Sequence, residues 1–389
     1  MRPRLEYRNG YKTLSPAEKD PAFFISQRSR FKLDYSSEKV SLFLALQDIR
    51  TWGSTSQLNL TDDFFSVHEV WGELHFTSQA HLKVGRQELV YDDQRIFGNV
   101  NWAQQGRSHD LALFRYEKGA FRGHAGFAYN QDQERLSSTF YETSNNYKTM
   151  QFLWLHVEPG KVKGSILFLN NGIQAADSSV NYSQTLGAYV NFDIWKLKSG
   201  ISAYYQMGKD LQERNLSAGY LAADLSLPMD AGIVPAVGIE FLTGTDQDEG
   251  SENHSFLPLF GTNHKFNGHM DYFYVGNHAN NVGLLNPYAR MAYKKGNWTV
   301  NGTLHYFSSA ARILDPEDPA SHMPNYLGTE LDLSVSWNIA AHVTLSGGYS
   351  QMFASESMQV LKGGDHTTAN NWAWLMLSFT PDIFIQKTE

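Results

Sequence analysis

The sequence predicts an all-β fold, a transmembrane antiparallel β-barrel of eighteen strands. Short stretches of alternating apolar and polar residues recur from Arg4 to Phe379, and tight polar turns alternate with longer loops between them. An alternation with a period of two puts every second side chain on one face of a strand. We expect no helix, and a chain that repeats this pattern without helices closes a sheet on itself.

The composition indicates which kind of barrel this is. The 389 residues include 20 Tyr, 24 Phe and 9 Trp, yet no apolar run approaches the ~18 residues that a membrane helix needs. In an outer-membrane barrel one face of each strand borders a wet lumen, while the other face and its aromatic girdles border lipid. We therefore expect a multi-pass barrel in a bacterial outer membrane rather than an inner-membrane protein. The absence of cysteine removes disulfide and metal-thiolate chemistry, and the modest net charge of −8 argues against nucleic acid as a partner.

The strands can be followed in order along the chain. The expected strands are Arg4–Arg8, Phe23–Tyr35, Val40–Trp52, Val67–Phe76, one that starts at His81, Asp110–Tyr116, Phe121–Asn130, Lys148–Val157, Val162–Asn170, Thr185–Ile194, Ser199–Met207, Leu216–Leu225, Val234–Leu242, Leu284–Tyr293, Trp298–Phe307, Tyr326–Trp337, Val343–Phe353 and Trp372–Phe379. Short turns on one side and long loops on the other are typical of a barrel with both termini in the periplasm. We expect one domain, residues 1–389, with a long extracellular loop at about 244–283.

The period of two also predicts which side chains face water. In the second strand Phe31, Leu33 and Tyr35 alternate with the charged residues Arg28, Arg30, Lys32 and Asp34. The charged set must face the lumen, because a lipid-facing Arg or Lys at mid-depth costs ~2–4 kcal/mol. By the same argument Leu331 and Leu333 face lipid, while Glu330 and Asp332 point inward. We expect a wet channel with charges of both signs rather than a packed core.

Three places do not fit a simple alternation. If Leu82 and Val84 face outward, Arg86 would face lipid, so we expect a β-bulge at Gly85 that resets the register and returns Arg86 to the lumen. The alternation is equally unclear around Asp48 and Asp110, and the facing of those side chains stays open.

Several motifs carry a family resemblance. They are the segment Val84–Arg95 followed by Trp102, Gly106-Arg107 and Asp110, together with Gln27–Arg30, Gln47–Gly53, Phe260–Asp271 and Leu327–Asp332. In this order the motifs resemble the alginate-export family of outer-membrane porins. The resemblance implies a monomeric eighteen-stranded barrel with an arginine-lined conduit for an anionic polysaccharide. One departure concerns gating. The link Asn338–His342 is too short to fold across the pore mouth, as a periplasmic flap of the family's name-giving exporter would. A constriction would then come from extracellular loops or lumenal side chains.

The expected mechanism is selection by fixed charge. A guanidinium group stays ionised and makes bidentate contacts with carboxylates, and repeated loose contacts let a polyanion move on. The expected pore-lining residues are Arg28, Arg30, Lys32, Arg86, Arg95, Arg50 and Arg107, with Glu69, Glu330 and Asp332 as carboxylates that hold arginine side chains in place. A structural interpretation of the same residues stays open, because ladders of arginine and carboxylate brace the walls of many porins.

The function expected from these observations is passive conduction of anionic solutes, above all acidic poly- or oligosaccharide. A weakly selective general porin and a barrel scaffold within a larger envelope complex, with its lumen closed by the 244–283 loop, are the alternatives. We expect no enzyme, because no nucleophile-elbow motif is present. We expect no cofactor and no metal, since His254, His264, His269 and His278 lack a tight ligand spacing. The expected partners are the anionic solute and outer-membrane lipid or lipopolysaccharide. A monomer is expected, and association with other envelope proteins stays open.

Overall fold

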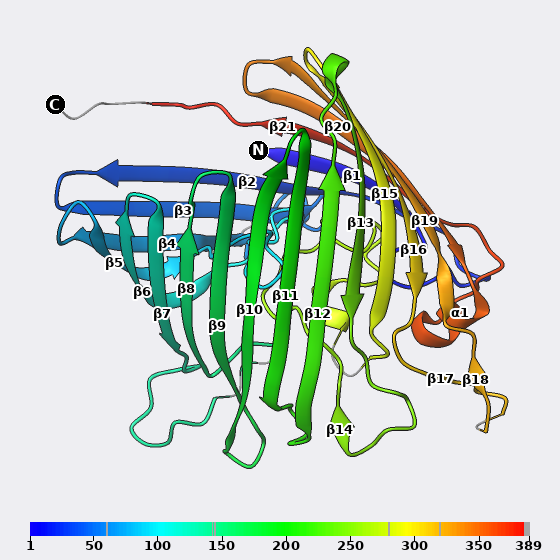
Figure 1. Ribbon diagram of the computed structural model, residues 1–389. Helices are drawn as coiled ribbons and strands as arrows, with labels where there is room; N and C mark the ends of the chain where they lie inside the picture. The colour runs from blue at the N-terminus through cyan, green and yellow to red at the C-terminus, as the bar shows by residue number, and fades with distance from the viewer. Residues whose placement is uncertain (60, 142, 144, 279–280, 319, 385–389) are drawn as a thin grey trace.

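The strands of this chain close into a barrel (Figure 1). The computed structural model describes residues 1–389 except 60, 142, 144, 279–280, 319 and 385–389. Each wall strand pairs antiparallel with the wall strands before and after it, and the first and last strands pair to close the ring. The wall strands are β1 (Arg2–Asn9), β2 (Ala22–Ser36), β3 (Val40–Thr51), β4 (Phe65–His75), β5 (Ala80–Gln87), β6 (His109–Lys118), β7 (Phe121–Tyr129), β8 (Thr149–Val157), β9 (Val162–Gln174), β10 (Val180–Ile194), β11 (Leu197–Lys209), β12 (Asn215–Ser226), β13 (Ile233–Leu242), β15 (Leu284–Lys295), β16 (Trp298–Ser308), β19 (Tyr326–Ala340), β20 (Val343–Ala354) and β21 (Asn370–Phe379).

The prediction of an eighteen-stranded antiparallel barrel is confirmed, whereas the expectation of no helix is wrong. A short helix, α1 (Glu356–Lys362), lies between β20 and β21, where the Ser355 side chain caps it by accepting from the backbone N–H of Met358. The smaller elements are β14 (Glu252–Asn253), the hairpin of β17 (Ile313–Leu314) and β18 (His322–Met323), and the 3₁₀ turns η1 (Asp230–Gly232) and η2 (Val275–Asn277). Among the described residues no helix is both long and apolar enough to span a bilayer.

The two ends of the barrel differ in their connections. We call the end with the short links the turn end and the opposite end the loop end. At the turn end β19 ends at Ala340 and β20 begins at Val343. This link is short, as the sequence predicts, and it has no room for a flap. The terminal amine of Met1 donates to the carbonyl oxygen of Phe379 at 2.9 Å, so Met1 and the last residue of β21 both lie at the turn end. Which side of a membrane that end faces stays a prediction.

The outer face is apolar toward the turn end and polar toward the loop end. On β2 the outward residues Phe31 and Leu33 are 53% and 56% exposed. Nearer the loop end the outward amides of Gln151, Asn170 and Gln184 form a row across β8, β9 and β10, with donor–acceptor distances of 2.7 and 2.8 Å. Outward polar groups at that height cost little, because the penalty for a charged side chain falls to ~0–1 kcal/mol near a membrane interface.

The expected β-bulge at Gly85 is wrong. The register between β4 and β5 runs without a shift from His75 opposite His81 to Val70 opposite Arg86, and Gly85 keeps its place with a φ of 129°. Arg86 therefore stays on the outer face and pairs with Asp110 at 2.9 and 2.7 Å in the polar band. This pairing at the edge of the apolar belt explains why an outward arginine is tolerated.

The register shift lies one strand earlier, between β3 and β4. Ala45 faces Glu69 and Leu46 faces Val67, which leaves His68 as the extra residue of a bulge. His68 and Glu69 are consequently both buried on the inner face, where they meet the segment that follows β5.

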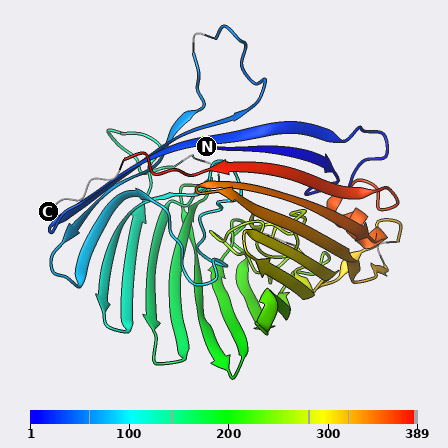
Figure 2. The same ribbon diagram turned by 90° about the horizontal axis from the view of Figure 1, so that it is seen from above.

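Two connections fold back into the barrel, as the traces inside the ring of strands show in Figure 2. We call residues 88–108 and 254–278 the inner segments. They meet in a bridge between Phe97 and Phe260, where the N–H of Gly98 donates to the carbonyl oxygen of Phe260 at 2.8 Å. Together with apolar side chains of β8 and β9, such as Phe152 and Leu169, they form a buried cluster. The expectation of a wholly wet lumen is therefore wrong on this side of the barrel, because these inner strand faces are apolar and the segments cover them.

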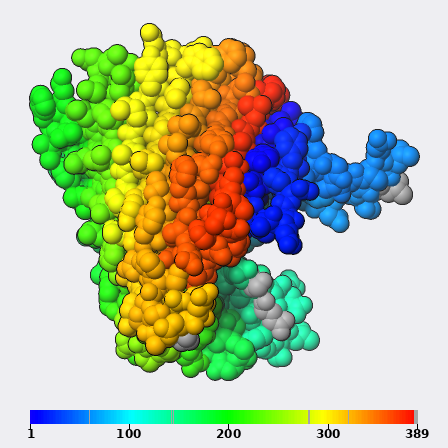
Figure 3. All heavy atoms as spheres, turned by 90° about the vertical axis from the view of Figure 1, so that its right-hand side faces the viewer, coloured from blue at the N-terminus to red at the C-terminus, as the bar shows by residue number. Residues whose placement is uncertain are grey.

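One connection leaves the barrel instead. Residues 53–59 and 61–64, between β3 and β4, project outward from the wall in Figures 2 and 3. Asp62 of this projection pairs with Arg50 of β3 at 2.7 Å, so the projection is tied to the polar band rather than to the lumen.

The facing of β19 can be tested with one substitution on each face. Leu333 points outward near the middle of β19 and is 46% exposed, whereas its neighbour Ser334 points inward and lines a lumenal cavity. We expect Leu333→Arg to lower the free energy of unfolding by ~2–4 kcal/mol, because the arginine would enter the apolar belt. Ser334→Arg should change it by less than about 1 kcal/mol, since the new side chain meets lumenal water. Urea unfolding of both variants in lipid vesicles, followed by tryptophan fluorescence, measures the difference, and equal losses would contradict the assignment.

Candidate arginine-lined lumenal site

Arginines gather on the inner faces of β1 and β2. Arg2, Arg4, Arg28 and Arg30, which we call the arginine cluster, lie on two adjacent strands, and Arg2 stands directly opposite Arg28 in the register. Arg4 pairs with Glu6 at 2.9 Å, and Arg30 lies 3.7 Å from Glu88 of an inner segment. Among the described residues neither Arg2 nor Arg28 has a carboxylate within 4.0 Å. The cluster therefore carries more positive charge than its neighbours neutralise.

Neutral oxygens of residues 101–105 take the place of carboxylates. Arg2 donates to the carbonyl oxygens of Trp102 and Ala103, at 3.2 and 3.4 Å, and to the side-chain oxygen of Gln104. Arg4 donates to the Trp102 carbonyl oxygen at 2.7 Å, and Arg28 donates to Asn101 Oδ1 at 2.9 Å. Three guanidinium groups of the wall thus converge on one short piece of backbone.

A glutamine also holds the fourth arginine. Both Nε and Nη2 of Arg30 donate to Oε1 of Gln47, at 3.1 and 2.7 Å. The Gln47 amide in turn donates to the carbonyl oxygen of Gln105 at 3.0 Å. One amide oxygen here accepts from two guanidinium nitrogens, at the place where a carboxylate would bind with both of its oxygens and more strongly.

Aromatic stacking fixes the position of this piece of backbone. The Trp102 ring lies parallel to the His264 ring at 3.9 Å between centroids, and edge-on to Trp372 and Trp374. The Arg4 guanidinium lies 4.1 Å from the Trp102 ring centroid on another side, a cation–π contact. Trp102 therefore links the arginine cluster to the second inner segment.

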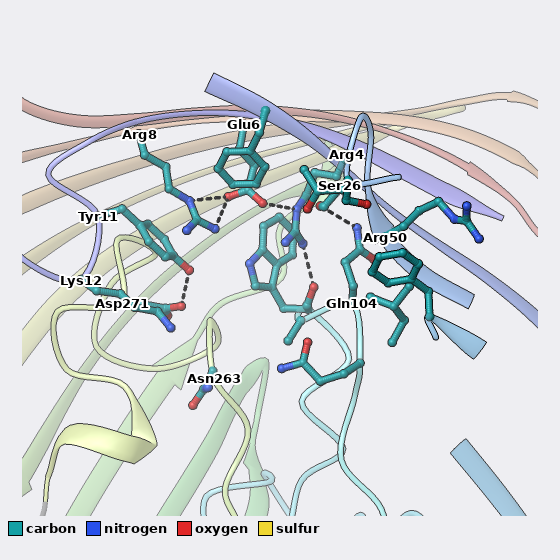
Figure 4. A pocket seen from close by; sticks show the side chains of 18 residues that line it. Arg4, Glu6, Arg8, Tyr11, Lys12, Ser26, Arg50, Gln104, Asn263 and Asp271 are labelled. Carbon is teal, nitrogen blue, oxygen red and sulfur yellow. Dashed lines mark hydrogen bonds and ion pairs between the residues drawn. The ribbon is translucent and has the colours of Figure 1, made fainter. Parts of the chain in front are cut away.

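A cavity of about 400 Å³, which we call the arginine cavity, lies beside these contacts. Figure 4 shows Arg4 and Arg8 converging on Glu6, and Tyr11 meeting Asp271 across the space. The cationic residues that line it are Arg4, Arg8, Lys12 and Arg50, and the carboxylates are Glu6 and Asp271. Because Glu6 is shared between Arg4 and Arg8, the lining has a surplus of positive charge.

A second cavity, of about 540 Å³, has a different character. We call it the tyrosine cavity, after Tyr189, Tyr220 and Tyr288 in its lining. Its charged lining residues are Asp92, Asp93, Asp224, Glu240, Lys265 and Arg290. Burial raises the pKa of Asp93 and lowers the pKa of Lys265, whose ammonium group donates to the Asp93 carbonyl oxygen at 2.6 Å. Both cavities border the two inner segments, so these segments shape the free space of the lumen.

Two buried carboxylates hold the second inner segment against the wall. Glu330 accepts from the backbone N–H of Met270 at 2.8 Å, and Asp332 accepts from that of His269 at 3.1 Å. The approach requires glycine at position 268, where φ is +85° and a Cβ atom would lie 2.6 Å from Glu330 Oε1. The prediction that Glu330 and Asp332 hold arginine side chains is wrong. They bind loop amides, because the segment fills the space in front of β19.

Three of the predicted lining residues lie on the inner face of β2. Arg28 and Arg30 belong to the arginine cluster, and Lys32 follows on the same face, opposite Ala45 of β3. Glu69 also lies on the inner wall and accepts from the backbone N–H of Glu88 at 2.9 Å. It positions an inner segment rather than an arginine.

Two further predicted residues, Arg95 and Arg107, lie inside the barrel and bind parts of the inner segments or the wall. Arg95 is 2% exposed, pairs with Glu240 at 3.1 Å and packs between the rings of Tyr220 and Phe266. Arg107 donates to the carbonyl oxygen of Gly261 at 2.7 Å and so joins the two inner segments, and burial lowers its pKa to about 10. The expectation that Arg95 lines the pore is wrong, because the inner segments enclose it. Arg107 is half-buried between the same segments, and its place in the pore lining stays a prediction.

Two arginines expected in the lumen lie on the outer face. Arg86 pairs with Asp110 there, as described above. Arg50 stands beside Gln27 in the register and pairs with Asp48 and Asp62, although it also borders the arginine cavity. The open question about Asp48 and Asp110 is answered in the same way, since both carboxylates face outward with their arginines.

Sequence reasoning missed Arg2 and Gln104. Arg2 precedes the first expected strand by two residues, and only its alternation with Arg4 could have revealed its facing. Gln104 lies in a connection without any periodic pattern, 102 residues from the arginine that it binds. No local signal in the sequence marks that contact.

One cluster of potential metal ligands occurs among the described residues, formed by His68, Glu69 and Glu88. Its polar atoms already bind one another, because His68 Nε2 lies 2.7 Å from Glu88 Oε1 and Glu69 accepts from the Glu88 backbone. Arg30 adds a positive charge 3.7 Å from the same carboxylate. These contacts fix an inner segment to the wall, and this role explains the three residues better than a cation site does.

Comparisons with known proteins agree with this architecture. The family model described as alginate export matches residues 1–372. Among solved structures, OpdL of Pseudomonas aeruginosa is similar with a TM-score of 0.66 and 12% identity, over 98% of this chain and 97% of that one. A BenF-like porin from Pseudomonas fluorescens Pf-5 is similar with a TM-score of 0.62 and 13% identity, over 97% and 96%. At these identities the structural likeness shows the fold alone. No curated protein matches the chain.

The anchoring of the second inner segment predicts a change in conductance. Asp332→Ala removes the acceptor of the His269 N–H and of the Ser350 hydroxyl, and leaving such buried donors unpaired costs ~1–3 kcal/mol each. We expect the segment to loosen and the single-channel conductance in planar bilayers to rise.

Asp332→Asn is the matched control, because its amide oxygen can still accept both bonds and should keep the conductance near that of the unchanged chain. Gly268→Ala should act like Asp332→Ala, since it pushes the same segment away from Glu330. Unchanged conductance in both loosened variants would show that the segment does not narrow the path.

Proposed function

The chain belongs to the alginate export family, and from this premise we propose that it is an outer-membrane channel that passively conducts anionic solutes, above all acidic poly- or oligosaccharide. The observation that carries the proposal is the arginine cluster on β1 and β2, in which Arg2 and Arg28 hold only neutral partners among the described residues. A guanidinium group bound to amide and carbonyl oxygens can exchange them for a carboxylate at a gain in charge pairing.

The distribution of charge supports transit of anions along one side of the lumen. On the β1–β2 side the arginines outnumber the carboxylates, since Glu6 is shared by Arg4 and Arg8, whereas on β4 and β6 the carboxylates Glu73 and Glu117 share one arginine. Both of those carboxylates pair with Arg115 of β6, at 3.0 Å each. An anion is therefore attracted to the β1–β2 side, where Arg2 and Arg28 have no carboxylate within 4.0 Å among the described residues.

The proposed movement depends on contacts that are numerous and weak. Several donors at successive positions, from Lys32 through Arg30, Arg28 and Arg4 to Arg8, line the inner faces of β1 and β2. A polyanion can release one guanidinium while it holds the next, so no single contact traps it. Arg86 and Arg50 take no part in this proposal, because they face outward.

A scaffold with a closed lumen is the second candidate, and the buried apolar cluster of the inner segments favours it. The two cavities favour a conducting path. Conductance of the purified chain in planar bilayers separates the two candidates, since a scaffold would give none.

Neutralising the inner arginines should reduce the preference for anions. In the double variant Arg28→Gln and Arg30→Gln we expect the anion-to-cation permeability ratio to fall roughly two- to tenfold, because a charge contact of ~0.4–1.4 kcal/mol is lost from the path. Reversal potentials in a salt gradient measure this ratio. The single variant Arg28→Gln should lower the ratio in the same direction by a smaller factor. Arg86→Gln is its matched control, because it removes one positive charge from the outer wall, and it should leave the ratio unchanged. An equal effect of both changes would contradict a lumenal origin of the selectivity.

The proposed cargo makes a separate prediction. Oligogalacturonate added to one side of the bilayer should block the current at lower concentration than a neutral oligosaccharide of equal length, and the difference should shrink as salt screens the charges. Equal block by both sugars would indicate a general porin that distinguishes solutes by size alone.

A further inference from the structure

Gln104 binds the arginine cluster in the manner of a carboxylate. Its Oε1 accepts from both Nε and Nη2 of Arg2, at 3.3 and 3.0 Å. Its amide nitrogen donates to Ser26 Oγ at 3.0 Å, and its backbone oxygen accepts from Arg28 at 3.4 Å. The residue is 6% exposed and borders the arginine cavity. One buried glutamine therefore contacts both arginines that lack a carboxylate.

The partnership leaves a charge imbalance. Arg2 and Arg28 are direct neighbours across β1 and β2, and like charges directly opposite each other are unfavourable. An amide oxygen satisfies the hydrogen bonds of Arg2 without neutralising its charge. A carboxylate in the same place would do both, and a charge-assisted bond is about twice as strong as a neutral one.

The Gln104 side chain can leave without dismantling its segment. The rings around Trp102 hold the segment two residues away, and Gln47 holds the backbone of Gln105. Among the described residues the Gln104 side chain forms hydrogen bonds with Arg2 and Ser26, and both residues belong to the wall. Release of the side chain would also expose Arg2 to the arginine cavity.

We propose that Gln104 is an internal mimic of a carboxylate, which holds Arg2 until a carboxylate group of the permeating anion displaces it. Arg2 thereby becomes a residue that determines specificity. The strength of the Gln104–Arg2 contact then sets how tightly an anion has to bind before it displaces the glutamine. This inference rests on the proposed function, because it concerns the same lumen and the same class of solute.

Two substitutions at one position should act in opposite directions. Gln104→Glu keeps the shape and supplies a permanent carboxylate, so we expect the apparent affinity of oligogalacturonate, measured by titrating its block of the current, to fall roughly five- to tenfold. Gln104→Ala removes the competitor, and the apparent affinity should rise by about two- to fivefold. Gln105→Glu is the matched control. It adds the same charge to the lining of the same cavity without a side-chain contact to Arg2, and should weaken block less than Gln104→Glu.

The coupling to Arg2 gives a second, independent measurement. In an Arg2→Gln background the difference between Gln104→Glu and Gln104→Ala should shrink to the effect of the added charge alone, which Gln105→Glu measures, since the group for which they compete is gone. Heat-modifiable mobility on gels verifies that each variant folds. Shifts of equal sign for Gln104→Glu and Gln104→Ala, or an undiminished difference between them in the Arg2→Gln background, would overturn the proposal.

The outcome is separable from that of the proposed function. Reversal potentials of the unchanged chain test anion preference, whereas opposite shifts of block at position 104 test the displacement. Polyglutamate carries carboxylates without a sugar ring and should show the same pattern as oligogalacturonate. A pattern confined to oligogalacturonate would overturn the carboxylate assignment in favour of recognition of hydroxyl groups.

Discussion

The closed sheet imposes the constraint on which the rest of this molecule depends. Because β1 pairs with β21, each wall strand has partners on both sides, and every residue of the wall must face either outward or into the lumen. The outward positions are filled by apolar side chains bounded by a polar band, so charged residues inside that belt have only the lumen available. The lumen then has to accommodate those charges, and the inner segments 88–108 and 254–278 largely serve that need.

The inner segments contact three parts of the wall, and they supply a different kind of group to each. Against β8 and β9 they supply aromatic rings, so that apolar inner faces become a packed cluster. Against β19 they supply backbone N–H groups to Glu330 and Asp332. Against β1 and β2 they supply carbonyl and amide oxygens. The partners on β1 and β2 are neutral, as are the backbone N–H groups on β19, but on β1 and β2 the wall charges that stay unneutralised are positive and lie on two adjacent strands. That sign and that grouping distinguish the arginine cluster from the rest of the wall.

Period and charge in the sequence were enough to predict the strand number, the closure and the inward facing of Arg28 and Arg30, because those properties depend on neighbours two residues apart. They were not enough for Arg86, whose facing depends on how far the apolar belt extends and on a partner across the sheet, Asp110. Arg95 and Gln104 depend on contacts with residues more than one hundred positions away, in connections that carry no repeating pattern. Topology, rather than residue type, decided these cases.

Arg95 and Arg2 show why the number of arginines in a lumen is a poor measure of selectivity. Arg95 has a carboxylate at 3.1 Å, lies between two rings and is enclosed, so that exchanging its partner would leave Glu240 as an unpaired buried charge. Arg2 would give up only neutral oxygens and would gain a charged partner. The same side chain is therefore a fixed brace in one place and an exchangeable donor in the other. Anion preference in this barrel should follow the arginines whose partners are neutral, whatever the total number of guanidinium groups that the wall encloses.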